Sequence, residues 1–351
     1  MATDTTFKTS KSLELWIPDH TDADNNHNLG TAVAVASANT WKGLQATSIS
    51  VDDVSAPVEV SATRSGLYVE GTSQGYARAD TQMYQIDATL RGSVYSVLAS
   101  TNAVFEDGVT AATLAGSFSP TSMVHGSAAT VMAPDLLVKN ASSDSSNTHM
   151  LYKSCLGTSV GFAQDHGTEG GELVVSTSFV SAYKPAQVAT AYLDSATAGS
   201  PVFDLGTPKR LTSTTCVVND GSSRELFLLG YDFTVSREIV RIACTPASAA
   251  SGTETFLPYG YAMTGGYEIA GTINVKRDDN LDDLYDDFVG SADYVSLTIT
   301  GASNFTVSFP KVKFDNPKPE VGDSFMTQTM PFRAFFDDAA LANNALSITV
   351  S

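Results

Sequence analysis

The sequence predicts a mainly β protein made of two tandem β-sandwich or barrel domains, each with a short α-helix. Three observations predict it: a composition rich in Ser, Thr, Ala, Val and Gly, segments that alternate apolar and polar residues, and patterns that recur in the two halves. Alternation with a period of two is typical of strands with one buried and one solvated face. A chain of 351 residues with 42% hydrophobic residues can bury the cores that two domains need.

The internal repeat starts with an alternating strand, followed further along by a Gly-Tyr-Ala triplet. Residues 48–52 and 75–77 supply these features in the first copy, and residues 232–236 and 260–262 supply them in the second. Several matches in one order at similar spacing indicate a duplication. The remaining matches are 84–90 with 267–273, 131–140 with 307–316, and 173–176 with 346–350.

The repeat defines the expected domain boundaries. We expect an N-terminal arm at 1–30, the first copy at 31–178, a linker at 179–208 and the second copy at 209–351. The linker contains prolines and small residues, which are typical of a segment that crosses a protein surface.

Two turns of hairpin composition lie in the second copy. Residues 219–221 (Asn-Asp-Gly) and 301–304 (Gly-Ala-Ser-Asn) each separate two apolar, strand-like segments. Such turns between strand-like segments predict antiparallel hairpins.

A short amphipathic helix is predicted over 278–288. Leu281, Leu284, Tyr285 and Phe288 recur at helical spacing and share one face, and an Asp at the start can cap the free backbone N–H groups. The aspartates of this segment lie on the opposite face and have no EF-hand loop around them. We interpret them as a solvated helix face and not as a calcium site.

The chain is acidic in both halves, with 38 acidic against 20 basic residues and a formal net charge of -18. Such a surface repels phosphates, which argues against a conventional DNA-gripping module. Two interpretations remain open. The charge can serve solubility, or it can line a channel along which DNA slides without sticking.

One segment matches the G-x-S-x-G pattern of a hydrolase nucleophile. It is 157–161, with Ser159 at its centre and Asp165 and His166 shortly after it. The hydrolase motif needs a helix after the Ser, and Asp and His much later in the chain. The residues that follow are too rich in glycine for a helix, so we interpret the segment as a Gly-bounded loop.

Possible metal ligands are dense in residues 19–27. Counted as an EF-hand loop, this segment has His27 and Val33 where Gly and Glu are required, which favours a flexible polar loop. His125 and His149 stand alone and are expected to be satisfied or surface side chains. The sequence has no Walker A, HExxH or dinucleotide motif. We therefore expect no enzyme, no cofactor and no metal.

Cys155, Cys216 and Cys244 are far apart, without a CxxC pair or a His at ligand spacing, and are expected to be small buried thiols. The N-terminus has no secretion signal, and no apolar run approaches the roughly 20 residues that span a bilayer. We expect a soluble protein made in a cytoplasm.

The C-terminal part of the chain carries several motifs in a fixed order. They are an acidic Leu-Tyr-Asp-Asp-Phe helix at 284–288, Phe-Pro-Lys-Val-Lys-Phe at 309–314, Thr-Gln-Thr-Met-Pro-Phe-Arg-Ala-Phe at 327–335 and a terminal strand at 348–350. Together they resemble the closing segment of major tail tube proteins of tailed bacteriophages. Residues 229–235 also look like the family's strand that leads into its stacking loop. The first copy is less similar, because it lacks a clear acidic helix after Leu98 and a "PFRAFF" run.

The resemblance implies a structural virion protein whose rings stack into the tube that conducts DNA out of the capsid. It implies assembly in the host cytoplasm, other tail proteins as partners (tape measure, terminator, distal tail or sheath), transient non-specific passage of viral DNA, and no membrane. Because single-domain members form hexameric rings, two copies per chain imply a trimer with pseudo-sixfold symmetry. Loops 55–75 and 245–258 are the candidates for contact between rings.

Within such a ring, the polar sides of the paired strands are the candidates for the lumen surface. An alternative function is another phage structural or adhesion β-sandwich protein, such as a capsid decoration or tail-tip protein. A hydrolase that uses Ser159 is a third. Alternation places these residues toward the lumen: Ser50, Asp52, Gln85, Asp87, Asp232, Thr234, Glu268 and Thr272.

Overall fold

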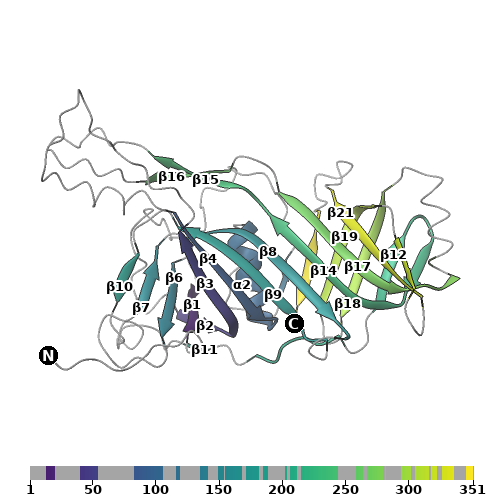
Figure 1. Ribbon diagram of the computed structural model, residues 1–351, viewed down its shortest axis with the longest axis horizontal. Coiled ribbons are helices and arrows are strands. Elements are labelled where there is room, and N and C mark those ends of the chain that lie inside the picture. The colour runs from purple at the N-terminus through teal and green to yellow at the C-terminus, as the bar shows by residue number, and fades with distance from the viewer. Residues whose placement is uncertain are drawn as a thin grey trace, which may run out of the picture.

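The protein is mainly β in the computed structural model, with mostly antiparallel sheets on which helix α2 packs (Figure 1). This confirms the predicted fold class at the level of a mainly β protein. The structure describes residues 13–19, 40–53, 83–105, 116–118, 135–140, 149–153, 155–167, 171–181, 185–188, 202–203, 206–211, 215–243, 258–263, 267–279, 281, 294–301, 305–315, 318–321, 326–335 and 345–350.

Within these residues, the strands form a six-stranded sheet, a fourteen-stranded sheet and a separate pair. The six-stranded sheet has the order β10 (Ala186–Val188), β7 (His149–Tyr152), β6 (Leu136–Asn140), β1 (Leu13–Asp19), β2 (Thr40–Leu44), β11 (Val202–Phe203). The larger sheet has the order β13 (Ser223–Leu226), β12 (Thr215–Asn219), β18 (Val295–Gly301), β19 (Phe305–Phe314), β21 (Met326–Ala334), β17 (Glu268–Lys276), β14 (Leu228–Ser236), β8 (Leu156–Asp165), β9 (Val174–Ser181), β4 (Tyr84–Arg91), β3 (Ala46–Asp53). Off this path lie β20 (Lys318–Val321) on β21, β22 (Ser347–Val350) on β19, and β5 (Gly116–Phe118) on β22. The separate pair is β15 (Ile239–Ala243) with β16 (Pro258–Met263).

Part of the larger sheet joins the two halves of the chain, which we call the first half (β1 to β11) and the second half (β12 to β22). We define the central sheet as the strands β3, β4, β9, β8, β14, β17, β21 and β20, in that order. Its middle is the pairing of β8 with β14, which runs from Asp165 opposite Gly230 to Ser159 opposite Ser236. The strands of both halves therefore form one uninterrupted ladder, which runs obliquely across the molecule in Figure 1.

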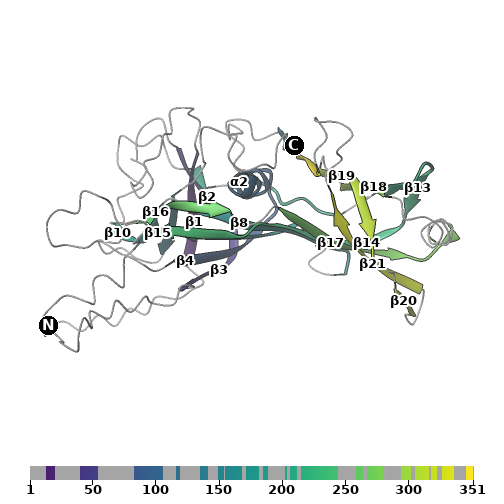
Figure 2. The ribbon, with the colours of Figure 1, turned by 90° about the horizontal axis from the view of Figure 1, so that it is seen from above.

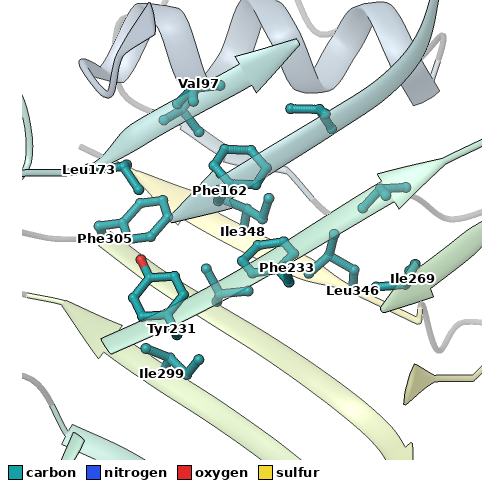
Figure 3. Packing of buried hydrophobic residues seen from close by; sticks show 14 of the residues in the cluster. Val97, Phe162, Leu173, Tyr231, Phe233, Ile269, Ile299, Phe305, Leu346 and Ile348 are labelled. Carbon is teal, nitrogen blue, oxygen red and sulfur yellow. The ribbon is translucent and has the colours of Figure 1, made fainter. Parts of the chain in front are cut away.

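One hydrophobic core extends through both halves on one side of the central sheet. Aromatic rings link the two halves there. Phe162 of β8 stacks on Phe233 of β14 with a centroid distance of 5.1 Å (Figure 3). The Phe233 ring also meets Phe309 edge to face at 5.1 Å. Each fully buried Phe contributes about 1.5–3 kcal/mol relative to an exposed one. The two halves therefore share one hydrophobic core and do not form separately packed domains.

Helix α2 (Val94–Phe105) covers the core side of the central sheet, where it contacts β8 and β9 (Figures 2 and 3). Ser93 caps its start, because the Ser93 Oγ accepts a hydrogen bond of 3.0 Å from the backbone N–H of Ser96. The helix starts before Leu98 and has no acidic residue in its first turn. Within the described ranges, no helix combines the length and apolar character needed to cross a bilayer.

The order of strand pairings is the same in the two halves. In the first half β1 pairs with β2 and β6, β6 with β7, β7 with β10, and β9 with β4 and β8. In the second half β12 pairs with β13 and β18, β18 with β19, β19 with β22, and β21 with β17 and β20. The registers agree too, since Ser50 lies opposite Asp87 as Thr234 lies opposite Ala270. We call residues at the same place in the two patterns counterparts.

Two expected irregular segments contain strands. Residues 13–19, expected in an N-terminal arm, form β1, which lies between β2 and β6. In the expected linker, residues 179–181 complete β9 and residues 186–188 form β10 on the edge of the six-stranded sheet. Leu15 and Ile17 of β1 are buried in the main core, so this segment belongs to the folded body.

Two of the sequence matches, 131–140 with 307–316 and 173–176 with 346–350, align strands that have different places in the two pairing patterns. Residues 173–176 lead into β9 and match β22 in sequence. In the pairing patterns, however, the counterpart of β9 is β21, and the counterpart of β22 is β10. In the other match, β6 takes the place of β18 and not of β19. The matches 48–52 with 232–236 and 84–90 with 267–273 do join counterparts, because β3 has the pairing place of β14 and β4 that of β17. Residues 75–77, the first Gly-Tyr-Ala triplet, lie outside the described residues.

The two antiparallel hairpins predicted in the second half are present. Asn219 lies opposite Ser223, and the Asn219 Oδ1 accepts a hydrogen bond of 2.9 Å from the backbone N–H of Gly221, whose φ is 113°. Gly301 lies opposite Phe305 in the second hairpin.

The predicted cap of the acidic helix is also present. The Asp278 Oδ1 accepts a hydrogen bond of 3.1 Å from the backbone N–H of Leu281, which is buried. Residues 280 and 282–288 of the predicted helix lie outside the described residues.

Candidate functional site

The candidate site is the side of the central sheet that faces away from the core, which we call the polar face. It arises from alternation in each strand. Ile86, Ala88 and Leu90 of β4 are buried in the core, and the residues between them point to the other side. The same alternation in β14 buries Phe233 and Val235 and leaves the residues between them exposed. Because the ladder is continuous, the polar face crosses from one half to the other.

All eight residues predicted for a lumen lie on this one face. In the first half Ser50 is opposite Asp87, and Asp52 is opposite Gln85. In the second half Asp232 is opposite Thr272, while Thr234 and Glu268 lie opposite Ala270 and Ser236. Five of these side chains are exposed and three are half-buried; the half-buried ones are Gln85, Asp87 and Thr272. The structure therefore brings together, on one surface, residues from both halves of the sequence.

Small side chains fill the middle of the polar face. Ser159 of β8 lies between Ser178 of β9 and Ser236 of β14. One row further along, Gly161 lies between Ser176 and Thr234. A Cβ added to Gly161 would come within 3.0 Å of the Thr234 Oγ1, so the close approach of these strands favours glycine. Ser176 and Ser178 were not predicted, although they alternate with Val175, Thr177 and Phe179 in the sequence.

Hydrogen bonds from neighbouring side chains stabilise two of the carboxylates on the polar face. The Asp87 carboxylate accepts hydrogen bonds from the Gln85 Nε2 at 2.9 Å and from the Ser178 Oγ at 2.5 Å. Partial burial raises the pKa of Asp232, and a hydrogen bond with Thr272 offsets part of this rise. These contacts hold the carboxylates in place through uncharged donors, so they do not cancel the negative charge.

The two arginines described on the polar face each lie near a carboxylate. Arg333 lies 3.5 Å from Glu268, and both side chains are more than 60% exposed, so the pair adds little stability. Arg91 donates from Nε and from an Nη to Glu172, which is 9% exposed. This hydrogen bond is the main reason why the pKa of Glu172 is lowered. Arg91 and Glu172 line an open groove of about 620 Å³ that also touches Asp165, Asp232 and Asn274.

Two buried polar contacts pin the halves together beside this groove. The Tyr231 hydroxyl of β14 donates to the Gln164 Oε1 of β8 at 2.6 Å, and the Gln164 Nε2 donates to the carbonyl of Gly171 at 3.1 Å. At the other end of the junction, Arg237 is buried, and its Nε donates to the carbonyl of Gly157 at 2.7 Å. Buried hydrogen bonds of this kind are costly to break, so the junction is a fixed part of the fold.

The hydrolase-like motif lies inside strand β8 and not in a loop, which corrects that expectation. The strand continues through Asp165, after which His166 is exposed in a turn, so the strand-to-helix turn of a nucleophile elbow is missing at Ser159.

Burial raises the pKa of the Cys155 thiol well above its usual value and that of Cys216 to about 12, which leaves both thiols protonated.

The part of the chain that the structure describes contains no group of three or more His, Cys, Asp or Glu side chains placed to hold a metal. His149 is buried in β7. Several sequence candidates lie outside the described residues: His125, Cys244, residues 20–27, and loops 55–75 and 245–258 apart from Pro258. Neither a protein-family model nor a curated protein matches the sequence.

Proposed function

We propose that this chain is a structural protein, a major tail tube subunit of a tailed bacteriophage, whose rings stack into a tube that conducts DNA. The central sheet is the observation that supports this function most strongly. It has a buried core on one side and, on the other, a continuous face of small polar and acidic residues drawn from both halves. Such a sheet is suited to line a water-filled lumen rather than to bind a small substrate.

The shared pairing order supports the proposal that the halves are tandem copies of one domain. Each half contributes four strands to the central sheet, β3, β4, β8 and β9 from the first and β14, β17, β20 and β21 from the second. Three chains would then supply about 24 strands at a spacing of about 4.8 Å, and with a tilt of about 40° the barrel would be roughly 48 Å across its backbone. After side chains are added, the lumen remains wider than duplex DNA.

The chemistry of the polar face suits a surface along which DNA passes. Affinity for DNA comes mainly from cations that neutralise phosphates. Here Asp52, Asp87 and Asp232 are on the face, which also carries Arg91 and Arg333, each against a carboxylate, and Lys313, opposite Arg333. Because acidic groups accompany most of its cations, a lumen of this kind binds the phosphate backbone weakly, so we expect transient, non-specific passage of viral DNA.

In this function the protein belongs to the virion, is assembled in the host cytoplasm, and contacts other tail proteins at the ends of the tube. It needs no cofactor, no catalytic residue and no membrane. We propose a trimer with pseudo-sixfold symmetry as the ring.

Negative-stain microscopy of the purified chain over a range of concentrations tests the function. We expect rings with a central hole, or stacked tubes, and a ring mass of three chains by light scattering. A chain that remains monomeric at high concentration, or that forms compact particles without a hole, would contradict it.

A further inference from the structure

The central sheet ends on two strands with one free side each. In the described residues β3 pairs only with β4, and β20 pairs only with β21. A free strand edge presents unpaired backbone N–H and C=O groups and pairs readily with another strand. Among the described residues, the central sheet therefore has two edges, one from each half, that are open to a further strand.

The junction between the halves shows how such edges fit together. There β8 pairs with β14, and the counterpart of β14 is β3. The counterpart of β8 is the last part of β19 followed by β20, because these residues pair with β21 as β8 pairs with β9. The free edge of β20 thus has the same place in the second half as the edge of β8 that receives β14.

Matching the counterparts gives a register for a contact between two chains. Ala163 lies opposite Asp232 in the junction, and their counterparts are Lys318 and Ser48. In the same way Val51 falls opposite Phe314 of the second chain. Asp52 falls opposite Lys313, which is exposed, so the register pairs an acidic group with a basic one.

Apolar residues near the free edges are more exposed than their counterparts at the junction, as expected if a neighbouring strand covers the latter only. Val235 of β14 is 0% exposed beside β8, whereas its counterpart Val51 is 37% exposed. Val180 of β9 is 6% exposed and packs with Ile239, whereas its counterpart Phe335 is 37% exposed. Apolar side chains that are buried inside the chain thus have more exposed counterparts at both ends of the central sheet.

We infer that β3 of one chain pairs antiparallel with β20 and the end of β19 of a second copy, in the register that β14 and β8 have within the chain. The Val51 and Phe314 side chains then close the apolar side, and Asp52 meets Lys313 on the polar face. The inference rests on the proposed function for the closure of the sheet into a ring, but the pairing can be measured without a tube.

Disulfide cross-linking between differently tagged, co-expressed chains tests the register. One chain carries Ser48→Cys and the other Lys318→Cys. In register the two Cα atoms are about 5 Å apart, within the range that a disulfide spans. Oxidation is expected to convert the monomer into a covalent heterodimer on a non-reducing gel, while each single variant expressed alone gives no such band and so controls for the native thiols.

Two matched pairs make the test specific. Thr329→Cys lies opposite Lys318 but one strand further from the edge, about 10 Å from Ser48, so Thr329→Cys with Ser48→Cys is expected to stay uncross-linked. Ala163→Cys with Asp232→Cys in one chain is expected to form an intrachain disulfide and shows that this register permits the bond.

The outcomes separate the inference from the proposed function. Rings without the Ser48–Lys318 cross-link would overturn the inference and leave the tube standing, and monomers without the cross-link would overturn both. Cross-linked chains that never form rings would support the pairing and contradict the tube.

A charge exchange provides a second measurement that needs no cysteine. Lys313→Asp and Asp52→Lys are each expected to reduce association, and the two changes together in one chain are expected to restore it. A double variant no better than either single variant would remove this pair from the interface.

Discussion

Two valines at counterpart positions should respond very differently to the same substitution. Val235 is fully buried against Val160 of β8, and Val51 is 37% exposed at the free edge of β3. Val235→Ser loses the burial of one Val, about 1.5–3 kcal/mol, and places a hydroxyl in an apolar site, which adds about 1 kcal/mol or more. We expect its free energy of unfolding to fall by about 3 kcal/mol. Val51→Ser should cost the isolated chain about 1 kcal/mol at most.

Urea unfolding of the monomeric chain, followed by fluorescence of Trp16 and Trp41, measures the first quantity, and sedimentation of assembled protein measures association. Val51→Ser is expected to reduce association strongly while the chain stays folded. Equal destabilisation by the two variants, or normal association of Val51→Ser, would refute the inference that β3 pairs with a strand of a second chain.

Three further predictions concern packing, the lumen and pH. A Cβ on Gly271 would lie 2.5 Å from the Asp232 carbonyl oxygen, so Gly271→Ala should lower the free energy of unfolding by about 1–3 kcal/mol, measured by urea unfolding. Asp87→Lys with Glu268→Lys should permit assembly but slow DNA ejection, and normal ejection kinetics would remove both residues from the lumen. Because the pKa of Glu172 is lowered from 4.5 in the folded chain, its stabilisation is complete above that value and is lost as the pH falls through the folded pKa. Glu172→Gln should therefore flatten the acid limb of stability in a thermal-unfolding series, and an unchanged pH profile would contradict this role.

Local alternation predicted which side each strand presents. The period of two in residues 84–90 and 267–273 placed Gln85 and Thr272 on the polar face, because a residue's side of a sheet follows from its immediate neighbours. The pairing of β8 with β14 was not predictable in this way. It depends on contacts between distant segments that no local pattern records.

The errors in the sequence interpretation also have physical reasons. Glycines suggested a loop at 157–161, but these residues lie within the continuous strand β8, where Gly161 leaves room for the Thr234 side chain of β14. Helix α2 gave no amphipathic signal, because Ser96, Ser100 and Thr101 are buried together with its apolar residues. A helix covered on most sides lacks the polar stripe by which periodicity is recognised.

The two kinds of junction are not expected to be equally strong. Inside the chain, the buried Tyr231–Gln164 hydrogen bond and Arg237 fix β14 to β8. The counterparts of Tyr231 and Gln164 are Thr47 and Pro319, which cannot form that bond. The linked halves also avoid the loss of translational and rotational freedom that association costs. A permanent junction within each chain and a weaker one between chains would let subunits remain soluble until they assemble, with half as many contacts to form per ring as six separate domains would need.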